Sequence, residues 1–239
     1  MSNSLSLRDG KANCVESLTK SELLRRKIRL VSPCTNENSP SLLTHPRLRE
    51  FYPELLFILH CTSRASVPLM EAALRCSRDR SPADAVAAGL AEYLERHIPE
   101  ELYHDEWMLE DMEVLGIDRV EVLKRIPPAP LAAAVGSQYY WIYHYHPVAF
   151  LGYVAVLEGD PTPKNIVEAA VVRSGLPREA FRSLLVHSDN DPNHRDDFNQ
   201  TLDRLPLRPE HTTVISVSAF QVACTIEEVF AQMLARFVG

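Results

Sequence analysis

The spacing of apolar residues predicts a chain built almost entirely of helices. From Pro46 to residue 237, leucine, isoleucine, valine and aromatic residues recur three and four positions apart, which is the period of one face of an α-helix. Pro99 and Gly116 are typical start and stop residues for one such segment. Alternation with period two is limited to TTVISVSAF at 212–220, which could form a strand in isolation. We therefore expect an all-α bundle of roughly seven helices.

The N-terminal part of the chain follows a different pattern. Residues 1–45 are rich in serine, asparagine, threonine and charged residues, with one helical candidate, KSELLRRKIRL, at 20–30. Four of its apolar residues could pack against a neighbour: Leu23, Leu24, Ile28 and Leu30. We expect an N-terminal arm at 1–45 and a single helical domain at 46–239.

Composition narrows the class of protein. A chain of 239 residues with 46% hydrophobic residues is long enough for one sizeable core. Its net charge of −7 argues against a nucleic-acid partner, since such proteins usually carry a clustered basic surface. Five scattered cysteines without a CxxC pair favour a reduced, cytoplasmic protein and give no support to thiolate-bound zinc. We see no signal peptide and no window approaching the roughly 18 apolar residues of a membrane span, so we expect no membrane.

The run HSDNDPNH at 187–194 raises the question of a metal site. On a helix, Asp191 would lie about 40° from His187 and His194 about 20° to the other side, so all three side chains would share one face. The alternative is a polar loop. Pro192 could end the helix at Asn190, and the shared face would then be lost.

The segment EELYHDE offers a second pair of donors. Glu101 and His104 have the Glu-x-x-His spacing that helical bundles use to present a carboxylate and an imidazole to one ion. The same spacing also occurs on ordinary solvated helix faces. His97 shares the face of His104 and is either an outer partner or a surface residue, so we leave it outside the ligand set.

A third donor stands alone. Glu158 ends the apolar segment PVAFLGYVAVLEG, where an ionised carboxylate is costly unless a cation compensates it. The alternative is a frayed helix end that faces water. Together the three segments offer oxygen and nitrogen donors without thiolate, which suit iron or manganese. Six donors are too many for one catalytic ion with open positions, and they suit two.

These motifs resemble the ligand pattern of a known family. Glu101-x-x-His104, the isolated Glu158 and His187-x3-Asp191-x2-His194 are similar to the ligands of the haem-oxygenase-like diiron oxidases, over about residues 50–237. The resemblance implies a haem-oxygenase-like seven-helix bundle that binds two Fe²⁺ through these six residues and uses O₂ as co-substrate. A ferritin-type protein would show two Glu-x-x-His motifs, and only one is present.

The resemblance also suggests a substrate class. Chain length and ligand layout resemble the cyanobacterial nitrile-synthase branch, which implies an oxidoreductase that converts a halogenated tryptophan to an indole-3-carbonitrile in natural-product biosynthesis. Other members decarboxylate fatty acids, so fold and site do not fix the substrate. We expect a small-molecule amino-acid substrate, and the sequence leaves a homodimer open. The stretch QYYWIYHYH at 138–146 could line a flat pocket, in which we place Tyr140 together with Phe57 and Val67, although core packing is the commoner use of aromatic residues.

Three rival interpretations remain. The dipeptide His104-Asp105 also occurs in HD-type metal phosphohydrolases, which would need an upstream histidine such as His60 and would leave Glu158 without a role. A metal-free, thiaminase-like relative would need a cysteine nucleophile, for which Cys61 or Cys76 could serve. A non-enzymatic helical scaffold would bind no iron, so metal analysis separates it from the oxidase.

Overall fold

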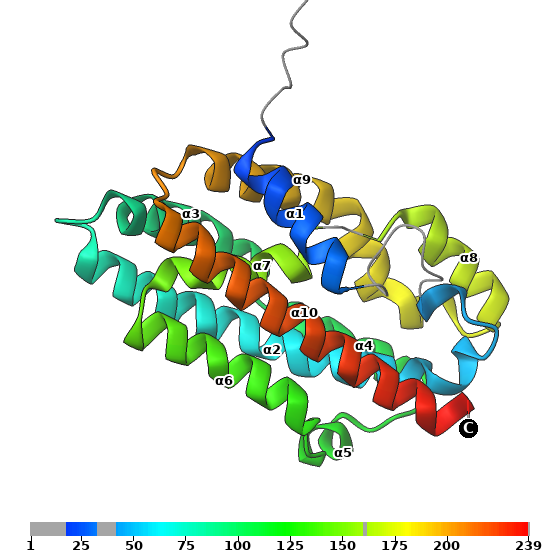
Figure 1. Cartoon of the computed structure of the whole chain (residues 1–239). Helices are drawn as coiled ribbons and strands as arrows, with labels where there is room; N and C mark the ends of the chain where they lie inside the picture. The colour runs from blue at the N-terminus through cyan, green and yellow to red at the C-terminus, as the bar shows by residue number, and fades with distance from the viewer. Residues whose placement is uncertain (1–17, 33–41, 160–161, 239) are drawn as a thin grey trace, which may run out of the picture.

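The computed structural model describes residues 18–32, 42–159 and 162–238, and leaves the side chains of 190–192 and 238 outside that description. Within these ranges the chain forms ten α-helices and three short 3-10 helices, and no strand. The α-helices, shown in Figure 1, are α1 (Lys20–Val31), α2 (Leu48–Arg80), α3 (Ala85–Glu101), α4 (His104–Val114), α5 (Arg119–Lys124), α6 (Ala129–His144), α7 (Leu151–Leu157), α8 (Lys164–Ser174), α9 (Arg182–Arg204) and α10 (Pro209–Val238). The 3-10 helices are η2 (Leu42–Thr44), η3 (Pro147–Phe150) and η4 (Arg178–Phe181).

The all-α prediction is confirmed, and its details need three corrections. The segment at 212–220 lies inside α10 and forms no strand. The described helices outnumber the predicted seven, because short elements such as α5 and α7 break the longer segments. Pro99 does not start a helix but lies inside α3.

The long helix α2 is the spine of the bundle. It packs against α3, α4, α6 and α10, and Figure 1 shows it running through the middle of the molecule. Large side chains on α2 are fully buried, among them Phe51, Leu56 and Leu69. The core therefore forms around α2, and α3 and α9 lie beside each other on one side of it.

The most apolar helix is α10. Its segment Pro209–Phe237 has a mean hydropathy of 1.5 over an 18-residue window, which is long and apolar enough to cross a membrane by length and composition. The expectation that no segment approaches the length and apolar character of a membrane span is therefore wrong for this helix. Half of that window is buried inside the bundle, where α10 packs against α6 and α7. Burial in the core accounts for its apolar character.

The helix expected in the N-terminal arm is present as α1. Thr19 and Glu22 form a capping box at its start, which satisfies backbone N–H groups of the first turn. Leu24 and Ile28 are buried, and α1 packs on α9 and α10. Nζ of Lys20 donates to the carbonyl oxygen of Asp203 at 2.9 Å. This part of the expected arm is thus docked onto the bundle.

Two close contacts fix the helices that carry the site. A Cβ at Gly152 would lie 2.4 Å from the carbonyl oxygen of Ile215, so only glycine lets α7 approach the backbone of α10 this closely. At the start of α9, Oδ2 of the buried Asp111 accepts hydrogen bonds from the backbone N–H of Ser183 at 3.0 Å and from its hydroxyl at 2.5 Å. These contacts set the depth of α7 and the start of α9.

Candidate metal centre

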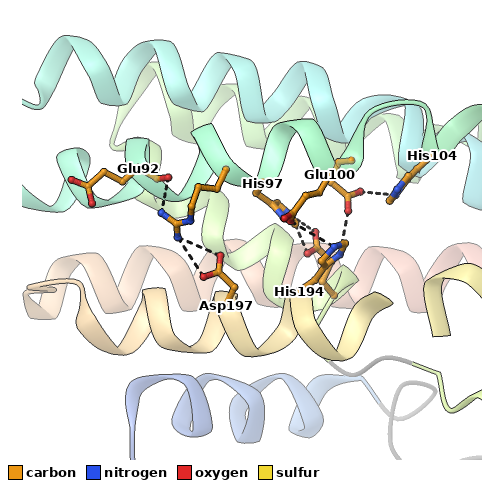
Figure 2. A network of polar contacts seen from close by, with 9 residues as sticks. Glu92, His97, Glu100, His104, His194 and Asp197 are labelled. Atoms are coloured by element: carbon orange, nitrogen blue, oxygen red, sulfur yellow. Dashed lines mark hydrogen bonds and ion pairs between the residues drawn. The ribbon is translucent and has the colours of Figure 1, made fainter. Parts of the chain in front are cut away.

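Three helices bring together a cluster of nitrogen and oxygen donors. His97 and Glu101 lie on the last turns of α3, Glu158 is the C-cap of α7, and His194 lies on α9. One donor atom from each of these four side chains lies within 4.8 Å of the others. Figure 2 shows His97 of α3 and His194 of α9 facing each other, with His104 of α4 farther along.

His97 and Glu158 form the most buried contact of the cluster. Nε2 of His97 lies 3.0 Å from Oε2 of Glu158, and the two side chains are 2% and 14% exposed. Burial acts to lower the pKa of His97, but the hydrogen bond and the charge of Glu158 outweigh it and raise the pKa to about 9. The alternative in which Glu158 is a frayed helix end facing water does not describe this side chain.

Glu101 faces donors on both sides. Its Oε2 lies 3.1 Å from Nδ1 of His104, and its Oε1 lies 3.5 Å from Nδ1 of His194. Burial acts to raise the pKa of Glu101, but the close contact with His104 and the charges of the neighbouring histidines lower it overall. Its carboxylate therefore lies between two groups of donors: a first group of His97, Glu158 and His194, and a second group around His104.

The second group contains His104 and His187. Their rings are 4.9 Å apart and nearly perpendicular, at 82°. Nδ1 of His187 lies 2.8 Å from the carbonyl oxygen of Ser183. Because a carbonyl can only accept, we assign the proton to Nδ1, which leaves Nε2 with a free lone pair. Burial lowers the pKa of His187, so its neutral, metal-binding form is favoured.

A break in the chain, not one continuous helix, creates the Glu101–His104 pair. Glu101 ends α3 and His104 begins α4. Between them Tyr103 has φ 69°, the one non-glycine residue with positive φ in the described part of the chain. The expectation of a Glu-x-x-His pair on one helix face is wrong, although the two side chains still meet. Such a conformation is costly for a tyrosine, and strain of this kind is typical of functional sites.

Two donor atoms of this region are buried without a hydrogen-bond partner among the described residues, as expected of atoms that bind a metal ion. Nδ1 of His104 and Oε2 of Glu158 are buried, and neither makes a hydrogen bond with a described residue. Each has a polar neighbour, at 3.1 Å and 3.0 Å respectively, but the angles do not suit a hydrogen bond. A cation would satisfy both atoms. With only imidazole and carboxylate donors, the cluster suits iron.

The structure brings five of the six predicted ligands into one region: Glu101, His104, Glu158, His187 and His194. The sixth, Asp191, has its side chain outside the described residues. The backbone of α9 continues as a helix through Pro192, so the shared face expected for 187–194 is present. Sequence reasoning left out His97, which the structure places in the cluster. Its position two turns before His104 was the available signal.

Three residues were predicted to line a substrate pocket: Tyr140, Phe57 and Val67. Tyr140 is 59% exposed, and its ring contacts Trp141 and His144 on its own helix. This exposure gives no support to the prediction that Tyr140 lines a substrate pocket, which stays a prediction. Phe57 is buried in the core beneath the guanidinium of Arg125, 3.6 Å from the ring centre. Val67 is half-buried on α2.

The rival interpretations lose support from the geometry. Burial raises the pKa of the Cys61 thiol to about 11 and also raises that of Cys76, which disfavours a thiolate nucleophile. His60 lies on α2 with Nδ1 3.1 Å from the carbonyl oxygen of Asp105, while His104 faces Glu101 and His187. A phosphohydrolase site would leave most of the donor cluster without a role.

Comparisons with known proteins give the family and the fold of the chain. A family described as iron-containing redox enzymes matches residues 59–223. A domain of unknown function with a heme oxygenase-like fold from Shewanella denitrificans OS217 has a similar structure, with a TM-score of 0.68, 16% identity, and coverage of 91% of this chain and 90% of that one. At this identity the likeness shows the fold alone. No curated protein matches the sequence. Because the family match covers well over half of the chain, the protein belongs to the iron-containing redox enzymes and has a haem-oxygenase-like fold.

Proposed function

We propose that the protein is a non-haem diiron oxidase that uses dioxygen to oxidise a small molecule. The observation that carries the proposal is the position of Glu101, whose two carboxylate oxygens face His194 on one side and His104 on the other. A carboxylate in that position can bridge two ions. Two ferrous ions bound there would supply two electrons for the reduction of dioxygen.

The side chains would divide between two ions. His97, Glu158 and His194 would hold one ion, and His104 and His187 the other, with Glu101 shared. Asp191, one helical turn from His187 on α9, is the natural candidate for a further oxygen donor to the second ion. Glu101 and Glu158 would supply the charged oxygen donors and would offset part of the positive charge of the ions.

Hydrogen bonds within the chain orient some of these donors in the iron-free protein. Ser183 fixes the tautomer of His187, and Asp111 in turn fixes Ser183 through two hydrogen bonds. Trp107 covers His104, with the two ring centres 4.1 Å apart. An apolar ring over a ligand limits the access of water and lowers the local dielectric constant.

The substrate proposal remains an amino acid, and its finer form is the conversion of a halogenated tryptophan to an indole-3-carbonitrile. That form rests on the resemblance of chain length and ligand layout alone, because Tyr140 faces away from the bundle. Oxidative decarboxylation of a fatty acid is the alternative. The two proposals are tested by incubating the iron-loaded protein and dioxygen with each substrate in turn. We expect oxidised products from the amino acid. Turnover of the fatty acid alone would replace the amino-acid proposal with the fatty-acid alternative.

The oxidase itself is tested by anaerobic loading with ferrous iron followed by exposure to dioxygen. We expect iron-dependent consumption of dioxygen, which is lost in His194→Ala. His144→Ala is the matched control, because His144 is an exposed histidine of α6 that contacts Tyr140 and lies outside the donor cluster. An iron-loaded wild-type protein that consumes no dioxygen in the presence of any candidate substrate would contradict the proposal.

A further inference from the structure

A further carboxylate, that of Glu100, lies on the outer side of the two cluster histidines His97 and His194. Oε2 of Glu100 is 3.4 Å from Nδ1 of His97 and 3.6 Å from Nε2 of His194. The two rings are nearly perpendicular, at 90°, with centres 5.3 Å apart. Figure 2 shows the Glu100 side chain reaching from α3 toward both rings. One oxygen atom therefore faces the outer nitrogen of two histidines that come from different helices.

The inner nitrogens of the same rings face the donor cluster. Nε2 of His97 lies against Glu158, and Nδ1 of His194 lies against Oε1 of Glu101. A metal-bound imidazole uses the lone pair of one nitrogen and carries its proton on the other. His97 must then carry the proton on Nδ1 and His194 on Nε2. The two histidines thus need opposite tautomers, and in both cases the proton belongs on the nitrogen that faces Glu100.

We propose that Glu100 is a positioning residue that orients His97 and His194 for metal binding by accepting an N–H hydrogen bond from each. This inference rests on the proposed function, because it takes both histidines as ligands. Carboxylates that accept from the distal N–H of a ligand histidine fix the ring and raise its basicity, and their loss typically lowers metal affinity by about 10- to 100-fold. Glu100 is 54% exposed, so its side chain can close the 3.6 Å contact without disturbing the core.

The sequence conceals this role. Glu100 precedes the predicted ligand Glu101, and neighbours on a helix usually point to different faces. Here α3 ends at Glu101, so both carboxylates lie in the final turn, where Glu101 points into the cluster and Glu100 covers its outer side. The exposed fractions differ accordingly, at 12% for Glu101 and 54% for Glu100.

The test uses Zn²⁺, a diamagnetic ion that binds the same imidazole and carboxylate donors. In ¹⁵N-labelled, zinc-loaded wild-type protein we expect ring N–H signals from His97 Nδ1 and His194 Nε2, protected from exchange with water. In Glu100→Ala both signals are lost and zinc affinity falls by about 10- to 100-fold. Glu100→Gln, which keeps an acceptor oxygen, retains part of both.

Two controls make the result specific. The ring N–H of His187 donates to Ser183 at 2.8 Å and should persist in every variant, which shows that the centre is still folded. Glu92→Ala removes one carboxylate from the same helix, and in Figure 2 that carboxylate points away from His97, so both signals and affinity should stay unchanged.

The outcomes separate this inference from the proposed function. Persistence of both N–H signals in Glu100→Ala overturns the inference, even if affinity falls, since Glu100 would then act through its charge alone. A wild-type protein that takes up no zinc overturns the inference and the proposed ligand set together. A protein that shows the expected zinc behaviour but, with iron, never reacts with dioxygen removes the oxidase proposal and leaves the role of Glu100 standing.

Discussion

Nε2 of His97 lies 3.0 Å from Oε2 of Glu158, although the two residues are 61 positions apart in the chain. The contact joins the end of α3 to the C-cap of α7 inside the bundle. A histidine and a carboxylate at this depth attract each other strongly, so the pair holds the centre together before a metal binds. Iron would then take the place of the proton that the pair shares.

The stability of the iron-free protein should depend on pH through His97. The pKa of histidine is about 6.5 in an unfolded chain and that of His97 is about 9 in the fold. Because the folded state binds this proton more tightly, the stabilisation is complete below about pH 6.5 and is lost as the pH rises through about 9.

Chemical denaturation of the iron-free protein measures this effect. We expect the free energy of unfolding to fall by on the order of 1–3 kcal/mol between these two pH values, and to fall clearly less in His97→Gln. Identical pH profiles for the wild type and the variant would show that His97 does not hold the proton.

Variants of the shared and unshared donors should differ in iron content. Glu101→Ala removes the carboxylate that faces both His104 and His194, so we expect both ions to be lost. His187→Ala affects the second group alone, and about one ion per chain should remain. Iron analysis of protein loaded without oxygen gives the two values, with circular dichroism to confirm helical content. Equal iron content in the two variants would argue against a shared Glu101.

Tyr93 carries a buried hydroxyl that has no partner among the described residues. Its ring stacks on His97, with centres 5.1 Å apart and the planes at 22°. Tyr93→Phe keeps the ring contact and removes an unsatisfied polar group, so we expect the free energy of unfolding to rise by about 1 kcal/mol.

Tyr52→Phe is the matched control for this change. The hydroxyl of Tyr52 donates to the carbonyl oxygen of Ala180 at 2.9 Å, and its loss should cost about 1 kcal/mol. Denaturant titrations of both variants give the comparison. A loss of stability in Tyr93→Phe as large as that in Tyr52→Phe would mean that the Tyr93 hydroxyl is hydrogen-bonded in solution.

The packing of α7 on α10 should tolerate no side chain at Gly152. Its Cβ would meet the backbone of Ile215 at 2.4 Å and of Ala219 at 2.6 Å, and backbone atoms cannot move aside cheaply. Gly152→Ala should therefore cost about 1–3 kcal/mol, and should weaken iron binding because α7 carries Glu158.

Gly136 provides the opposite case within α6. A Cβ there meets nothing within 4 Å, so Gly136→Ala should stabilise the protein by about 0.5–1 kcal/mol through helix propensity alone. The two variants can be compared in one thermal unfolding series. A stable, fully iron-loaded Gly152→Ala protein would show that α7 does not lie this close to α10.

The helical period and the donor motifs could be predicted from the sequence because both depend on local spacing. His187 and His194 share a face of α9 for that reason, and Glu158 was marked by its apolar neighbours. The position of His97 two turns before His104 was a signal in the sequence, but its contact with Glu158 could not be predicted, because that residue comes from a distant helix. Tyr140 shows the same limit in reverse: its neighbours are aromatic, but the position of α6 at the edge of the bundle turns the ring outward.

The central claim is that this fold holds two irons that share Glu101. Anomalous diffraction at the iron edge, from crystals of protein loaded with ferrous iron without oxygen, tests it most directly. The account predicts two peaks, one among His97, Glu158 and His194 and one beside His104 and His187, with Glu101 between them. A single peak at full occupancy, or iron bound away from these side chains, would contradict it.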